Sequence, residues 1–161
     1  MPPMSSPTAR AVNWLSAEEM LAWRSYVETN ADLMATLERD LAPTGLDLGD
    51  YQVLVFLSES PAQALRMCDL AGRLQLSPSG LTRRLDGLVR SGLVERRGSD
   101  SDRRVMLAAL TPKGVRRLEE SAPIHVASVR RRMIDLLDGD ELQVIATVFQ
   151  KIRTALEDDT A

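Results

Sequence analysis

The chain has 161 residues, of which 44% are hydrophobic and 27% charged, and its net charge is −3. This length and apolar content suit a small protein with a real hydrophobic core. A single cysteine, Cys68, excludes an intramolecular disulfide framework, and one cysteine with one histidine argues against a protein-only zinc site. No apolar run is long enough to span a membrane, and the N-terminus lacks a signal-peptide core. We therefore expect a cytoplasmic protein without a metal or cofactor.

The positive charge is concentrated in the middle of the sequence. Residues 1–60 carry a net charge of −6, residues 61–104 carry +4, and residues 105–161 carry −1. Arginine accounts for 18 of the 20 basic residues, and its planar guanidinium suits bidentate contacts with phosphates and bases. Because local potential governs association with phosphates, the acidic total does not exclude a polyanionic partner for the middle segment.

The first half of the chain contains two expected helices. Ser16 and Glu19 have capping-box spacing, so a long helix is expected to begin at Ser16 and to end near Pro43. Its apolar residues recur at helical spacing at Met20, Trp23, Val27, Met34, Leu37 and Leu41. A second helix is expected over 48–57, with Asp47 as its N-cap.

Short elements follow in the basic middle segment. We expect a short strand at 64–66 and a short helix at 67–74. The Ser-Pro pair at the start of 77–90 is a strong helix-start signal, and Ser91-Gly92 ends that helix. The extended segments 93–97 and 104–110 flank a polar loop, which predicts a β-hairpin.

Two more helices are expected in the last third. Thr111-Pro112 opens a long helix that is expected to run through Leu137. Asp138 and Glu141 repeat the capping-box spacing and start a final helix. Its apolar positions are Val144, Val148, Ile152 and Leu156.

The order of elements predicts a mainly α fold with a small β-hairpin wing, namely a winged helix-turn-helix flanked by long helices. The apolar stripes of those long helices must pack against something, and a second copy of the chain is the simplest partner. The expected organisation is a flexible tail (1–13), an N-terminal dimerisation helix (14–46), a winged helix-turn-helix domain (47–111), C-terminal dimerisation helices (112–157) and an acidic tail (158–161).

The helix that begins at Ser77 has the features of a DNA recognition helix. In a helix-turn-helix, the N-terminal residues of the second helix contact base edges. Ser79, Thr82 and Arg83 share one face by their spacing, and Arg84 is added to the set. Arginine can bind guanine bidentately. The inward stripe of this helix is Leu81, Leu85 and Leu88. For Ser77 alone, an ordinary helix cap is an equal alternative to a DNA contact.

The expected wing is rich in arginine. Arg96 and Arg97 are expected to lie along the DNA backbone. At the tip, Asp102 precedes Arg104 by two residues, so its carboxylate can brace the guanidinium for entry into a narrow minor groove, and Arg103 joins this set. The alternative is a hairpin kept soluble by mixed charge.

The runs LSPSGLTRRLDGLVRSGLVER and SDRRVMLAALTPKG resemble the multiple antibiotic resistance regulator (MarR) family of bacterial transcription factors. Weaker similarity extends across residues 16–156. The family's wing signature is matched by Asp102, Arg104, Leu110 and Thr111. The resemblance implies that Arg104 enters the minor groove while Asp102 holds it, and that the exposed recognition-helix residues contact the major groove. It further implies a homodimer on a pseudo-palindromic operator, and a repressor released by a small aromatic or lipophilic molecule.

Several residues are candidates for sensing such a molecule. Trp23, Tyr26, Tyr51, Phe56 and His125 can line an effector cleft, although each residue type is more often part of a core. For Cys68, a buried structural role is favoured over a redox role.

Two other classes of function are weighed against the DNA-binding one. An enzyme is disfavoured because the chain has one histidine, one cysteine, no glycine-rich phosphate loop and no suggestive pair of carboxylates. A winged-helix module that binds proteins without specific DNA binding is the main alternative. The arginine-rich wing and the Ser/Thr/Arg helix start favour DNA.

Overall fold

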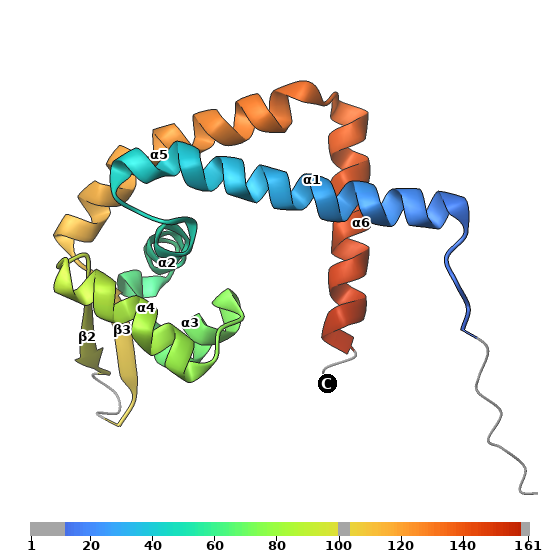
Figure 1. Ribbon diagram of the computed structural model, residues 1–161. Helices are drawn as coiled ribbons and strands as arrows, with labels where there is room; N and C mark the ends of the chain where they lie inside the picture. The colour runs from blue at the N-terminus through green and yellow to red at the C-terminus, as the bar shows by residue number, and fades with distance from the viewer. Residues whose placement is uncertain (1–11, 100–103, 159–161) are drawn as a thin grey trace, which may run out of the picture. The chain divides into compact units, whose positions relative to one another are not determined.

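The computed structural model describes residues 12–99 and 104–158, and it is mainly helical with a small antiparallel sheet (Figure 1). The chain divides into two compact units, one up to Met34 and the other from Ala35 onward. The expected fold class is confirmed. Most of the two predicted tails lies outside the described residues.

The described residues form the helices and strands that the sequence predicts, joined by three short 3-10 turns. The helices are α1 (Ala17–Leu41), α2 (Leu48–Ser58), α3 (Met67–Leu74), α4 (Pro78–Arg90), α5 (Pro112–Arg132) and α6 (Gly139–Asp158). The strands are β1 (Ala64–Arg66), β2 (Val94–Gly98) and β3 (Met106–Leu110), and the 3-10 turns are η1 (Ala42–Thr44), η2 (Pro61–Gln63) and η3 (Ile134–Leu136).

The predicted helix caps are present. The side chains of Asp47, Ser77 and Thr111 each accept a hydrogen bond from the backbone amide three residues later, at 2.6, 3.1 and 3.0 Å. These bonds satisfy amides that have no partner within the helix. Reciprocal capping boxes are formed by Ser16 with Glu19 and by Asp138 with Glu141.

The predicted continuity of the helix from Thr111 to Leu137 is wrong. Helix α5 ends at Arg132, and Met133 leaves the helical region at φ −140° and ψ −63°. The apolar spacing continues through this point, so the sequence carries no stop signal there. The break coincides with an ion pair between Arg130 and Asp135 at 2.6 Å. Arg131 and Arg132 next to it bind Asp40 at the end of α1, at 3.0 and 3.4 Å.

The three strands form one antiparallel sheet in the order β1-β3-β2. Ala108 of β3 pairs with Leu65 on one side and with Arg96 on the other. The second wing strand is shorter than predicted, because Arg104 lies in a turn before it rather than in the strand. One further bond, from the amide of Ser99 to the carbonyl of Val105 at 2.9 Å, extends the hairpin past β2.

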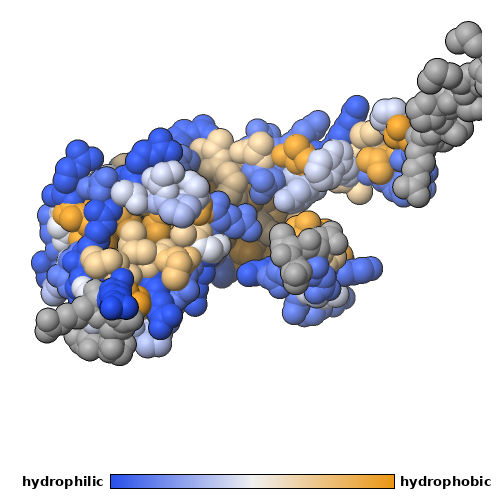
Figure 2. All heavy atoms as spheres, turned by 90° about the horizontal axis from the view of Figure 1, so that it is seen from below, coloured by the Kyte–Doolittle hydropathy of each residue, from blue (hydrophilic) through white to orange (hydrophobic). Residues whose placement is uncertain are grey.

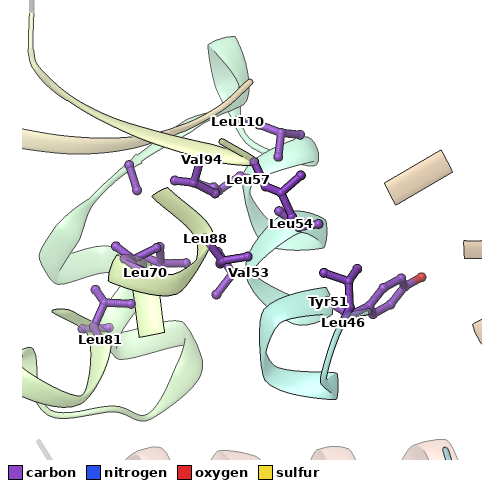
Figure 3. Packing of buried hydrophobic residues seen from close by; sticks show 14 of the residues in the cluster. Leu46, Tyr51, Val53, Leu54, Leu57, Leu70, Leu81, Leu88, Val94 and Leu110 are labelled. Carbon is purple, nitrogen blue, oxygen red and sulfur yellow. The ribbon is translucent and has the colours of Figure 1, made fainter. Parts of the chain in front are cut away.

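Side chains from α2, α3, α4 and the sheet converge in one hydrophobic core, in which Leu54, Leu57, Leu70, Leu81 and Leu88 point toward one another (Figure 3). The predicted inward stripe of α4 is confirmed, since its three leucines are at most 1% exposed. Full burial of such a side chain contributes about 1.5–3 kcal/mol, so this stripe holds α4 firmly to the domain.

The long helices keep many apolar side chains at the surface. In α1 only Leu37 and Leu41 are buried, and no described residue of α6 is buried. The exposed apolar residues include Leu21, Trp23 and Val27 of α1 and Val144, Val148, Ile152 and Leu156 of α6. Orange, hydrophobic residues along α1 are visible in Figure 2. Among the described residues, no helix combines the length and apolarity that crossing a bilayer requires.

Tyr51 and His125 form a ring contact between α2 and α5. Their ring centroids are 4.6 Å apart, and Tyr51 projects from the side of α2 opposite to Leu70 (Figure 3). The Nδ1 atom of His125 is buried and has no hydrogen-bond partner among the described residues. Desolvation by burial lowers the pKa of His125 below its usual 6.5.

We expect Gly114→Ala to destabilise the fold. A methyl group at Gly114 would overlap the carbonyl oxygen of Leu93 and the side chain of Leu110. Overpacking of this kind typically costs about 1–3 kcal/mol of unfolding free energy, measurable by urea denaturation. The matched control is Gly87→Ala in α4, where a methyl would meet no described atom within 4 Å. This control should gain about 0.5–1 kcal/mol from helix propensity. Equal effects would contradict the packing described at Gly114.

We also expect part of the acid sensitivity of the fold to come from His125. Its folded-state pKa is lowered, so the unfolded chain takes up the proton first as pH falls through 6.5. Stability is therefore retained above that pH and lost below it. The melting temperature of the wild type should fall more than that of His125→Gln between about pH 7.5 and about pH 5.5. An identical fall in both proteins would show that burial of His125 does not disfavour its charged form.

Candidate nucleic-acid interface

The N-terminal half of α4 presents three polar side chains on one exposed face. Ser79, Thr82 and Arg83 are all exposed, while the leucines on the opposite face are buried. The Thr82 hydroxyl donates to the carbonyl of Pro78 at 2.9 Å, which leaves its lone pairs able to accept. Ser77 holds the start of the helix as its cap and also contacts the Ser79 hydroxyl at 3.2 Å. The structure thus brings the predicted recognition residues together.

Arg84 differs from these three exposed residues, because its guanidinium forms ion pairs within the protein. Its Nη1 atom lies 2.6 Å from a carboxylate oxygen of Asp47 and 2.8 Å from one of Asp50. Both acids lie at the start of α2, so Arg84 links α4 to α2. The sequence gives no sign of these ion pairs, because the two aspartates lie 37 and 34 residues before Arg84.

Desolvation is the main influence on the Asp50 carboxyl in this cluster. Burial raises the pKa of Asp50, the neighbouring charge of Asp47 raises it further, and hydrogen bonding to Arg84 opposes both. Without the guanidinium, two carboxylates would face each other across a partly buried space. The arginine therefore makes this arrangement of charges favourable.

Arg96 of the wing also contacts α4. Its Nη2 atom donates to the carbonyl of Thr82 at 3.1 Å and lies 2.8 Å from a carboxylate oxygen of Asp86. These contacts tie β2 to the recognition helix, and the predicted contact of Arg96 with the DNA backbone stays a prediction. Arg97 is exposed and lies 3.8 Å from Glu95.

The tip of the wing is only partly described. Arg104 is exposed in the turn that leads into β3. Asp102 and Arg103 lie outside the described residues. The bracing of Arg104 by Asp102 therefore stays a prediction.

The five effector candidates make three different kinds of contact. Trp23 and Tyr26 of α1 are 56% and 47% exposed, and their ring centroids are 6.2 Å apart. Phe56 is half-buried and lies beneath the guanidinium of Arg73, at 5.7 Å. The other two candidates form the tyrosine–histidine contact between α2 and α5.

A surface pocket of about 260 Å³ lies where the start of α2, the end of α4 and the start of α5 meet. Leu46 and Leu88 are among its apolar lining residues, and Asp50, Lys113 and Arg117 among its charged ones. None of the five effector candidates lines this pocket. Its residues are scattered over the sequence, so no motif could have identified it.

The prediction of a buried Cys68 is wrong. Cys68 is exposed, and its sulfur lies 3.5 Å from a carboxylate oxygen of Asp69. The buried residues of α3 are Leu70 and Ala71. Cys68 lies at the second position of this short helix, and the helical period turns it away from that face.

Known transcriptional regulators are similar to this chain in sequence and in fold. Residues 44–105 match the model of the MarR family. AbsC from Streptomyces coelicolor, a MarR family transcriptional regulator of known structure, is 40% identical with a TM-score of 0.88 over 91% of this chain and 99% of that one. The regulator Sco3205 from the same organism, solved in complex with DNA, is 35% identical with a TM-score of 0.85 over 89% and 94%.

A relative with an assigned regulatory role supports the same assignment. The transcriptional repressor YetL of Bacillus subtilis is 26% identical over 141 residues, which are 86% of this chain and 84% of the repressor. The similarity therefore includes the long helices as well as the winged domain. With the exposed face of α4 and the hairpin beside it, these matches show that the chain belongs to the MarR family of winged helix-turn-helix transcriptional regulators.

Proposed function

We propose that this protein is a repressor that binds a pseudo-palindromic site in double-stranded DNA as a homodimer. The observation that carries the proposal is the exposed set Ser79, Thr82 and Arg83 at the start of α4, set opposite a fully buried leucine stripe. These side chains can enter a major groove while the stripe keeps the helix on the domain. The DNA complex of the 35% identical relative supports this role.

The uncovered apolar faces of α1 and α6 support a homodimer. Apolar stripes on long helices bury against a partner, and a second copy offers the same stripes by two-fold symmetry. Two recognition helices would then contact half-sites about 34–36 Å apart, or a multiple of that distance. The two-fold symmetry of the dimer makes the operator a pseudo-palindrome.

The wing supplies the second set of proposed contacts. Arg104 precedes β3 and is exposed, so it can enter a minor groove beside the recognition helix. Arg97 is available to the DNA backbone. Asp102 and Arg103 complete the proposed tip.

The proposal includes release by a small aromatic or lipophilic molecule. The contact between Tyr51 and His125, with a buried Nδ1 atom that lacks a partner among the described residues, supports a site at this position. A ligand acts only if it binds one spacing of the two recognition helices better than another. In this proposal the protein acts in the cytoplasm. It regulates by binding DNA and ligand, and it does not catalyse a reaction.

We expect Arg104→Ala to weaken operator binding without separating the dimer. Loss of one good arginine contact costs about 1–3 kcal/mol, which a gel-shift titration resolves. Arg153→Ala in α6 removes the same charge outside the winged domain, where Arg153 pairs with Glu157. This control should keep the wild-type affinity. Light scattering should give the mass of the dimer for the wild type and for both variants. Unchanged operator affinity of Arg104→Ala would refute the wing contact.

We expect binding to the DNA upstream of its own gene to fall steeply with salt. Each neutralised phosphate contributes about 0.9 to the slope of log K against log salt. The preference for this fragment over a random duplex of equal length should persist at every salt concentration, as in specific binding. Loss of both the slope and the preference would favour the alternative, a winged-helix module that binds proteins.

A further inference from the structure

The ion pairs of Arg84 link the recognition helix α4 to the start of helix α2. The guanidinium lies on Asp47 and Asp50 at the first turn of α2, while Arg84 itself follows directly after Arg83 in α4. Its side chain is 28% exposed, less than either side chain of the Arg97–Glu95 pair in the wing. Arg84 is therefore a half-buried link, whereas Arg83 is exposed.

Gly49 provides the space that this link requires. A methyl group at Gly49 would overlap the guanidinium carbon and both terminal nitrogens of Arg84. Any larger residue at this position would displace the guanidinium. The guanidinium therefore lies directly against the α2 backbone.

Three acidic side chains lie at this link, and Arg84 pairs with two of them. Asp47 is needed as the helix cap, because it accepts from the amide of Asp50 at 2.6 Å. The Asp50 carboxylate has no such local task, and its partly buried position beside another carboxylate is unfavourable on its own. Glu38 adds a third negative charge nearby, since it accepts from the amide of Leu48 at 2.9 Å. Arg84 offsets this concentration of negative charge.

The link supplies a constraint that the leucine stripe lacks. Hydrophobic burial of the stripe sets which face of α4 points outward, but burial is non-directional and does not fix the exact rotation of the helix about its axis. Hydrogen bonds from one guanidinium to two fixed carboxylates are directional. A rotation of α4 would break them and would also turn Ser79, Thr82 and Arg83 away from the base edges.

We propose that Arg84 is a positioning residue that sets the rotation of the recognition helix through Asp47, Asp50 and Gly49, and that it does not contact DNA. This inference rests on the proposed function, because it requires that α4 contacts bases. It changes the role predicted from the sequence, in which Arg84 joins the DNA-binding set.

Two roles of Arg84, positioning of α4 and direct contact with a phosphate, can be distinguished by measuring affinity at several salt concentrations. The measurement uses the DNA upstream of the gene and a random duplex. An arginine bound to phosphate contributes about 0.9 to the salt slope, and a positioning arginine contributes nothing directly. Arg84→Ala should lower affinity for the upstream DNA by about 5- to 150-fold, which is the cost of one mismatched base pair. The salt slope and the affinity for the random duplex should stay close to the wild type.

Two variants in α2 test the same link from the other side. Asp50→Asn removes a negative charge, which by electrostatics alone would strengthen binding to any DNA. Gly49→Ala leaves the charge unchanged and displaces the guanidinium. Both should instead weaken binding to the upstream DNA as Arg84→Ala does, and the pair Arg84→Ala with Asp50→Asn should be non-additive. These variants also keep the test informative if Arg84→Ala itself fails to fold, which circular dichroism would show.

Arg90→Ala is the matched control, because it removes the same charge from the far end of α4. It should preserve the preference for the upstream DNA. A salt slope lowered by about 0.9 in Arg84→Ala, with stronger binding by Asp50→Asn, would overturn the proposal and assign Arg84 to a phosphate. A wild-type protein without any preference for the upstream DNA would instead overturn the proposed function, and this inference with it.

Discussion

The buried leucine stripe of α4 is the constraint on which the rest of the interface depends. Leu81, Leu85 and Leu88 are at most 1% exposed, and each contributes about 1.5–3 kcal/mol by burial. Because the helical period is set by backbone geometry, burial of this stripe turns Thr82 and Arg83 outward. The burial of the leucines therefore determines which direction the polar residues face.

Two arginines add directional contacts between α4 and its neighbours. Arg84 joins α4 to α2, and Arg96 joins it to β2 through Asp86. Each of these ion pairs is partly exposed, and exposed pairs contribute only about 0–1 kcal/mol to stability. Their importance therefore lies in geometry, since they limit how α4 and the wing can turn relative to the core. The same residue type that suits DNA phosphates is used here inside the protein.

The charged residues fall into two groups, one that is engaged within the domain and one that remains exposed. The acidic first part of the chain includes Glu38, Asp47 and Asp50, which gather at the start of α2, where Arg84 pairs with the two aspartates. Arg83 and Arg104 remain exposed on the recognition helix and the wing. A net charge of −3 is thus compatible with a DNA-binding surface, because several of the acids are engaged within the domain.

Local signals in the sequence determined the helices, their caps, the hairpin and the outward face of α4. The signals for the helices and their caps lie within four residues of one another, as when Asp47 caps α2 through the amide of Asp50. The partners of Arg84, Arg96 and Asp40 could not be predicted in this way, nor could the end of α5 at Arg132. The hydrogen bond that Arg84 donates to Asp47 spans 37 residues, and the one that Ser128 donates to Asp40 spans 88. Only the packed core brings such groups within hydrogen-bond distance, so only the tertiary structure decided which arginines pair within the protein and which remain exposed.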